Sequence, residues 1–138
     1  MLRLVFALAV AVWLGGVVCL SFVVAPAAHG TFPTPEARRF LRPIFPRYYR
    51  LGYLCGSVAL AAVLLGRASL SQEEIARLAV PIAFALVAGL VGGEILLPRL
   101  QASSGEQGGF DRLHQVSAML NTATLAALAL ALAGAVLR

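Results

Sequence analysis

The chain has 138 residues, of which 60% are hydrophobic and only 12% are charged. Soluble domains contain about 45–50% apolar and about 25% charged residues, so this composition excludes a disordered tail and an ordinary soluble enzyme domain. Eleven arginines against six acidic residues give a net charge of +5. In a membrane protein, basic residues that flank the spans set their orientation. The positive charge is therefore explained without nucleic-acid binding, which we do not expect. The sequence therefore predicts a single-domain, all-α integral membrane protein.

Four apolar segments are each long enough to cross a bilayer as a helix. A span needs about 20 mainly apolar residues to cross roughly 30 Å of hydrocarbon, and only a helix satisfies its own backbone polar groups in lipid. We expect helices over about 4–28, 48–65, 72–98 and 111–137. Short links predict an antiparallel four-helix bundle with both termini on one side. The first segment has Arg3 and a cleavage-like Ala25-Pro26-Ala27, yet its apolar run is too long for a signal peptide, so we expect it to be retained.

The first link is predicted to hold a short helix over about 35–41. Thr34 is a suitable N-cap, Pro35 favours the first helical position, and Glu36 complements the helix dipole there. Arginines and large apolar residues occur together in this link. We therefore expect the short helix to lie in the plane of the lipid headgroups.

The other two links also carry local signals. Ser71 and Glu74 match a capping box, so the third helix should begin near Gln72. Pro81 should kink that helix as it enters the bilayer. The third link, 101–109, is rich in Gly and Ser and is predicted to be a flexible loop.

The distribution of arginines predicts the orientation of the chain. Seven of the eleven fall on the side of the first and third links, and four fall on the side of the termini. Basic residues accumulate on the cytoplasmic side. We therefore expect the first and third links in the cytoplasm and the termini outside, in a bacterial inner membrane.

Small and aromatic residues indicate how the helices pack. Two GxxxG patterns occur, Gly52 with Gly56 and Gly89 with Gly93. Such patterns let helices approach closely in lipid, either within the chain or in a homo-oligomer. Tyr48 and Tyr49 stand where the second helix enters the membrane, as in an aromatic belt. Trp13 is mid-span, which suggests bundle packing or, alternatively, the wall of a pocket.

Polar residues of three helices are predicted to meet at one face of the membrane. Polar groups are costly in a bilayer and mark candidate functional sites. The candidate ligand-binding residues are Arg47, Arg50, Glu94, His114, Ser117 and Asn121. The last three share one face of the fourth helix. Either Glu94 forms a structural ion pair with Arg47 or Arg50, or these residues surround a polar cavity for a small ligand, ion or cofactor.

Haem and metal binding are weaker alternatives for the same region. His29 and His114 could serve as axial haem ligands or bind a transition metal. Cys19 and Cys55 lie at comparable predicted depth and could bind a soft metal, although cysteine is often a small apolar packing residue. The chain has no recognised catalytic motif, which argues against an enzyme.

Several of these residues carry a family resemblance. The relevant stretches are Trp13-Leu14-Gly15-Gly16 with Phe22 and Pro26, then Phe45-Pro46-Arg47-Tyr48-Tyr49, Glu94 with Pro98-Arg99, and Phe110 with His114, Ser117 and Asn121. Together they resemble the small four-helix membrane proteins related to transmembrane protein 205, a domain of unknown function. The resemblance implies the same four-helix architecture and a site around Arg47, Glu94, His114 and Asn121. More distantly, the chain is similar to copper-resistance protein D and to small haem-binding, protoporphyrinogen-oxidising membrane proteins, which motivates the metal and haem alternatives.

Three functions remain open from the sequence. The first is a non-enzymatic membrane protein that binds or passes a small ligand or ion through the polar face of the bundle. The second is a haem- or metal-dependent redox protein. The third is a structural or assembly factor whose glycine-rich faces pack on another membrane protein or on a second copy of the chain.

Overall fold

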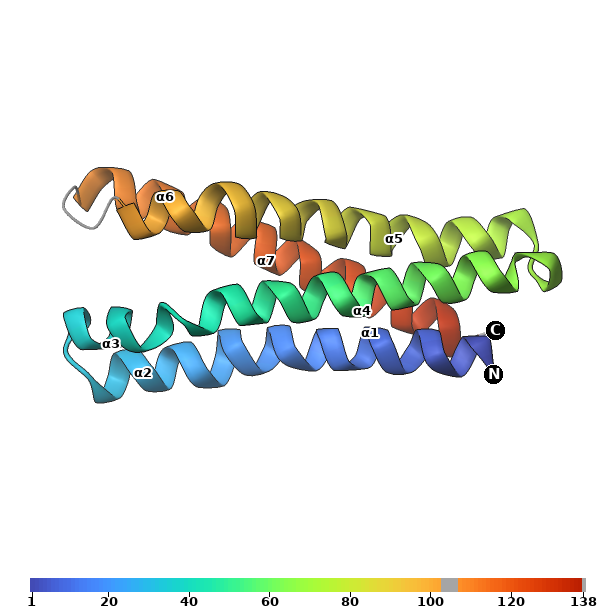
Figure 1. Ribbon diagram of the computed structural model, residues 1–138, viewed down its shortest axis with the longest axis horizontal. Helices are drawn as coiled ribbons and strands as arrows, with labels where there is room; N and C mark the ends of the chain where they lie inside the picture. Colours follow the sequence, from blue (N-terminus) through green and yellow to red (C-terminus); the bar gives the residue numbers. More distant parts are fainter. Residues whose placement is uncertain (103–106, 138) are drawn as a thin grey trace.

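The computed structural model describes residues 1–102 and 107–137, and it confirms the all-α class. Four helical stretches are long and apolar enough to cross a membrane: Leu2–Thr31, Thr34–Ser69, Gln72–Ala102 and Asp111–Val136. They lie side by side as one elongated bundle, and the two termini lie at the same end (Figure 1). The chain is therefore a multi-pass membrane protein with an even number of spans.

Each span is built from one or more helical elements. The first consists of α1 (Leu2–Val18), the π-helical segment η1 (Cys19–Val24) and α2 (Ala25–Thr31), and the second of α3 (Thr34–Leu41), α4 (Ile44–Gly66) and the 3₁₀ turn η2 (Arg67–Ser69). The third consists of α5 (Gln72–Leu90), the π-helical segment η3 (Val91–Leu96) and α6 (Leu97–Ala102), and the fourth is α7 (Gln107–Val136). Helix α1 packs on α4 and α7, and α5 packs on the same two helices. The bundle is thus a four-membered ring in which sequence neighbours are also spatial neighbours.

Both π-helical segments end two residues before a proline. Segment η1 precedes Pro26, and η3 precedes Pro98. A proline lacks the backbone N–H, and its ring collides with the carbonyl four residues earlier; that carbonyl belongs to Phe22 in η1 and to Glu94 in η3. Widening the helix by one residue per turn relieves this collision, and such segments are frequent at functional sites.

Pro81, where a kink is predicted, lies inside a continuous α-helix. Helix α5 continues as an α-helix through Pro81, and the π-helical turn comes later, in front of Pro98. The capping box is confirmed: the Ser71 hydroxyl accepts from the Glu74 backbone N–H at 3.2 Å, and Glu74 Oε2 accepts from the Ser71 N–H at 3.0 Å. Residues 103–106 of the predicted flexible third link lie outside the described residues.

The short helix of the first link differs from its prediction in two ways. Helix α3 begins at Thr34 itself, so the N-cap is Pro33 and no side chain caps the helix. It lies alongside α2, in line with the long axis of the bundle, and not across that axis (Figure 1). Its buried Ala37 and Leu41 pack with Ala28 of α2 in a small apolar cluster of their own. This cluster holds α3 against the bundle, because the apolar face is covered by protein and not by lipid.

The main core runs along the axis of the bundle, and the outer surface is largely apolar. The core contains fully buried Phe6, Ile82 and Leu128 from three different spans. On the outside, large apolar residues such as Leu54, Val80 and Phe84 are exposed, as lipid-facing residues must be.

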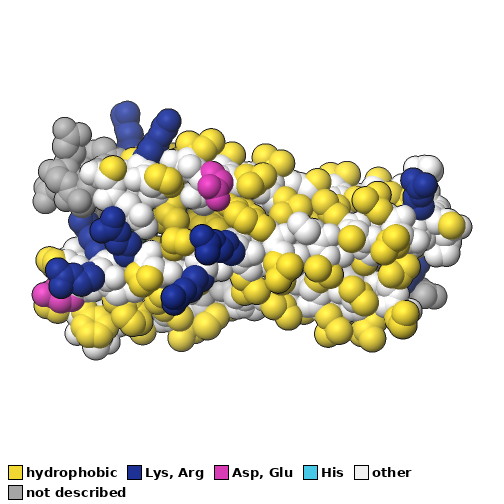
Figure 2. Space-filling model, viewed as in Figure 1, with side chains coloured by type: hydrophobic (Ala, Val, Ile, Leu, Met, Phe, Trp, Pro, Cys, Tyr) yellow, Lys and Arg dark blue, Asp and Glu magenta, His cyan; other side chains and the backbone are white. Residues whose placement is uncertain are grey.

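Arginine side chains gather at the end that carries α3 and α6, and most of the remaining face is apolar (Figure 2). On α5 and η3 the exposed charges Arg77 and Glu94 are 17 positions apart, or about 25 Å along the axis, which approaches the thickness of a bilayer core.

Candidate functional site

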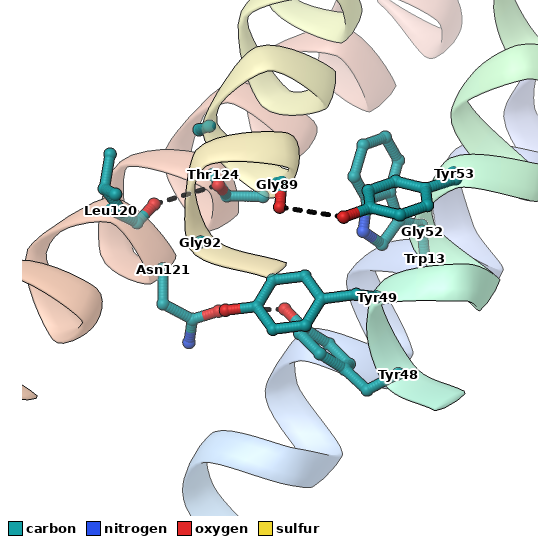
Figure 3. A pocket seen from close by; sticks show the side chains of 11 residues that line it. Trp13, Tyr48, Tyr49, Gly52, Tyr53, Gly89, Gly92, Leu120, Asn121 and Thr124 are labelled. Carbon is teal, nitrogen blue, oxygen red and sulfur yellow. Dashed lines mark hydrogen bonds between the residues drawn. The ribbon is translucent and has the colours of Figure 1, made fainter. Parts of the chain in front are cut away.

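A cluster of aromatic and polar side chains lies between the four spans, at the level of the two π-helical segments. Tyr48 and Tyr49 project from one turn of α4 and Tyr53 from the next, toward α5 and α7, and Trp13 of α1 lies beside them (Figure 3). They surround a small cavity of about 10 Å³, which is about the size needed for one water molecule. The lining residues are Trp13, Tyr48, Tyr49, Gly52, Tyr53, Ala88, Gly89, Gly92, Leu120, Asn121 and Thr124.

Asn121 joins three spans through hydrogen bonds. The Tyr48 hydroxyl donates to Asn121 Oδ1 at 2.8 Å, and Asn121 Nδ2 donates to the Ser21 hydroxyl of η1 at 2.6 Å. Hydrogen bonds between helices replace the bonds to water that a bilayer cannot offer. The amide therefore ties α7 to η1 of the first span and to α4 at one depth.

Tyr53 links α4 to the third span. Its hydroxyl lies 3.2 Å from the Gly89 carbonyl oxygen and 3.2 Å from Glu94 Oε1, so one O–H donor serves two acceptors. The neighbouring Tyr49 ring packs against Gly92, where a Cβ would come within 2.7 Å of the Tyr49 hydroxyl. Ser117 of α7 interacts with that same hydroxyl. The glycines of η3 thus make room for two tyrosine rings.

Trp13 is buried between the spans, with 3% of its surface exposed. A Cβ at Gly52 would meet its Nε1 at 2.7 Å, and one at Gly56 would meet its Cζ3 at 2.8 Å. The GxxxG pattern of α4 therefore accommodates an indole ring within the chain. Figure 3 shows the indole nitrogen next to Gly52, at the cavity. Among the described residues no hydrogen-bond acceptor is found for this N–H, and the nitrogen is not a fully buried atom, because every buried side-chain nitrogen or oxygen of the described residues has a partner.

The predicted site residues divide into an inner and an outer group. Asn121 lines the cavity and Ser117 interacts with Tyr49 beside it. Arg47, Arg50, Glu94 and His114 are exposed on the outside of their helices. All come from the same end of the bundle, but they do not surround one cavity.

The predicted ion pair of Glu94 with Arg47 or Arg50 is replaced by a hydrogen bond from Tyr53. An ion pair joins Arg3 to Glu74 at the opposite end, at 2.8 Å. The reason lies in the faces of α4. Tyr49 and Tyr53 are one turn apart and face inward, whereas both arginines are exposed.

The candidate metal and haem ligands are spread over the surface and the core. His29 at the end of α2 is exposed, as is His114. Cys19 is exposed and Cys55 is buried, and both are free thiols. Within residues 1–102 and 107–137 no three metal-ligating side chains come together.

The sequence does not predict Ser21, Tyr53 or Gly92 as site residues, and it predicts Gly52 and Gly89 for helix packing but not for a cavity. A usable signal was present: Tyr49 and Tyr53 recur one helical turn apart, and Gly89 and Gly93 recur at the same interval on the third span. Large rings on one helix need small residues on the facing helix. The glycine pattern predicts close packing of helices within the chain or in a homo-oligomer, and in the structure these glycines of the third span pack against tyrosine rings.

Replacing Tyr48 by phenylalanine is expected to lower the free energy of unfolding by about 0.5–1.5 kcal/mol, because a hydrogen bond to Asn121 is lost. Tyr53→Phe should lower the free energy of unfolding by less, because the two hydrogen bonds of the Tyr53 hydroxyl are longer and one of them is exposed. Thermal unfolding in detergent, followed by circular dichroism, measures both. A double-mutant cycle with Asn121→Ala should show coupling for Tyr48, and additive effects would contradict the proposed bond.

One family matches the sequence. Residues 8–108 match a family described as Domain of unknown function (DUF4149). No curated protein and no solved structure is significantly similar to the chain. The matched region includes the first three spans with Trp13 and the three tyrosines, whereas Asn121 and Thr124 lie beyond it.

Proposed function

The chain belongs to the DUF4149 family of domains of unknown function, and we propose that it is a non-enzymatic membrane protein that binds a small anion beside Trp13. The observation that carries this proposal is the indole N–H of Trp13, which lies at the cavity (Figure 3) and has no hydrogen-bond acceptor among the described residues. A bound molecule that accepts a hydrogen bond would give this donor a partner.

The surrounding groups favour an acceptor as the ligand. An indole N–H can only donate. The nearby acceptors are already engaged, because Asn121 Oδ1 accepts from Tyr48 and the Gly89 carbonyl accepts from Tyr53. A cavity of about 10 Å³ limits the ligand to roughly the size of water. Its size supports binding in preference to passage of a larger solute.

The arginine-rich end supports a negative charge on the ligand. The seven arginines on the side of the first and third links are Arg38, Arg39, Arg42, Arg47, Arg50, Arg99 and Arg112. On the same side these seven arginines outnumber the four acidic residues Glu36, Glu94, Glu106 and Asp111, and an excess of one sign of charge raises the local concentration of ions of opposite sign. Glu94 does not line the cavity, and its Oε1 accepts from Tyr53.

The orientation and the wider relationships of the chain are part of the proposal. By the positive-inside rule the arginine-rich end faces the cytoplasm and the termini face outward, in a bacterial inner membrane. The motifs around Trp13, Tyr48 and Asn121 support a relationship to the proteins related to transmembrane protein 205. A reporter fused to the C-terminus tests the orientation: activity on the outside supports it, and activity in the cytoplasm contradicts it.

The fluorescence of Trp13 tests anion binding, because the chain contains one tryptophan. The protein in lipid nanodiscs is titrated with chloride or fluoride at constant ionic strength, with gluconate as the bulky replacement anion. We expect a saturable change in tryptophan emission for one of the two halides. A site that holds only water gives no saturable response, and this result would refute the proposal.

A matched pair of glycine variants ties the response to the cavity. A Cβ at Gly89 would meet Tyr53 Cε1 at 3.6 Å, an ordinary contact, whereas a Cβ at Gly15 would meet nothing within 4 Å. Gly89→Ala therefore fills the cavity without a collision. We expect it to weaken halide binding at least tenfold, while Gly15→Ala binds as the wild type does. Equal binding by the two variants would place the response elsewhere and contradict the proposed site.

A further inference from the structure

A second and much larger cavity lies at the opposite end of the bundle, near the termini. Its volume is about 480 Å³, which falls within the range of about 300–1,000 Å³ typical of small-molecule sites. All four spans contribute to its wall. The lining residues are Met1, Leu2, Arg3, Phe6, Ala62, Val63, Gly66, Ser69, Leu70, Leu78 and Ala135.

The wall of this cavity is apolar, with a cation at one side. Phe6, Val63 and Leu78 are buried core residues, so the inner part of the cavity offers aromatic and aliphatic surface. The Ser69 hydroxyl donates to the Gly66 carbonyl at 2.9 Å and is thereby satisfied within the chain. Arg3 is the charged side chain of the lining. An apolar body with a negatively charged head matches this distribution.

Arg3 keeps donors for a ligand although it is ion-paired. Its Nη2 donates to Glu74 Oε1 at 2.8 Å, and its side chain is 37% exposed. A guanidinium carries five N–H donors, so others remain for a second carboxylate. Exposed Arg67 and Arg77 add positive charge at this end, and the aliphatic part of Arg77 packs near Gly134 of α7.

The depth of the cavity suits a molecule that comes from the bilayer. Its inner residues reach the apolar core, and Arg3 stands at the terminal end, where charged side chains meet the membrane surface. The anionic amphiphiles of a membrane have this same arrangement, an apolar chain below a charged head. The limited volume favours one chain over two.

We propose that this cavity binds a fatty-acid-like, single-chain anionic amphiphile, with its chain against Phe6, Val63 and Leu78 and its carboxylate at Arg3. The site is separate from the polar cavity. Phe6 and Trp13 are seven residues apart on α1, or about 10 Å along the helix. The proposal therefore stands whether or not an anion binds beside Trp13.

Native mass spectrometry of the detergent-purified protein tests this site with oleate and with oleyl alcohol, which has the same chain and no charge. The wild type should bind one oleate, at least tenfold more tightly than the alcohol. Ala62→Leu fills the cavity and should lose oleate, whereas Ala61→Leu, on the exposed side of α4, should bind it as the wild type does. Arg3→Gln should reduce the preference for oleate over the alcohol at least fivefold.

Two results would overturn the proposal. One is equal oleate binding by Ala62→Leu and Ala61→Leu, and the other is an unchanged preference in Arg3→Gln. If Ala62→Leu does not fold, as judged by its circular dichroism, Ala135→Leu replaces it, with Ala133→Leu on the exposed side of α7 as its control. Oleate binding by Ala135→Leu equal to that of its control would then refute the site.

Discussion

Trp13→Ala is expected to lower the free energy of unfolding by about 3–5 kcal/mol, the range for a large aromatic residue removed from a packed core. Trp13 is 3% exposed and its ring fills the space over Gly52 and Gly56 of α4. Because neither glycine has a side chain to close the gap, truncation leaves a cavity between α1 and α4. Thermal unfolding in detergent, followed by the helical circular dichroism signal, measures the loss without relying on tryptophan emission.

Phe84→Ala is the control for Trp13→Ala. Phe84 is a large aromatic residue on the outer face of α5 and is 50% exposed, so its truncation leaves no internal cavity. We expect a loss of well under half that of Trp13→Ala. Trp13→Phe should fall between the two, since it keeps a ring over the glycines. Equal losses for Trp13→Ala and Phe84→Ala would contradict the central position of Trp13 in the packing.

Gly52→Val is the second substitution with a large expected effect. A Cβ at Gly52 would lie 2.7 Å from Trp13 Nε1 and 2.9 Å from its Cε2, which is closer than van der Waals contact. Overpacking of this kind costs about 1–3 kcal/mol, occasionally more, and valine adds two further methyl groups to the collision. The same unfolding measurement should place Gly52→Val near or above the upper end of that range.

Gly15→Val serves as the matched control, because a Cβ at Gly15 meets nothing within 4 Å. It should change stability little. A second check uses the partner of the collision: in a Trp13→Ala background the indole is gone, so Gly52→Val should cost much less than it does in the wild type. Strictly additive effects would mean that the two residues do not share the same space.

The spans were predictable from the sequence because membrane insertion depends on length and hydropathy alone. A helix of about 20 apolar residues is the expected structure in lipid, and the capping box at Ser71 is a local signal that needs no tertiary context. Helix α3 was predicted in position but not in orientation. Its apolar face could have met lipid or protein, and the sequence does not distinguish a lipid-covered face from one covered by α2.

The interior of the site was predicted less well, since it depends on which helix faces meet. Asn121 was identified because polar residues are rare in a span, but its partners Tyr48 and Ser21 are set by helix rotation. An ion pair of Glu94 with an arginine was expected because their charges are opposite. In the structure, Tyr53 of α4 donates a hydrogen bond to Glu94 instead. The π-helical segments before Pro26 and Pro98 shift the register of both helices, and α5 passes Pro81 without such a segment.

The single indole N–H of Trp13 tests the central claim most directly, because it is the donor that the proposed anion would engage. An indole ¹H–¹⁵N correlation spectrum of the labelled protein in nanodiscs should contain one tryptophan peak. We predict that this peak shifts saturably with the halide in the wild type and in Gly15→Ala, and that it does not shift in Gly89→Ala. A peak that does not move with either halide, or that moves equally in Gly89→Ala, would contradict the proposed site.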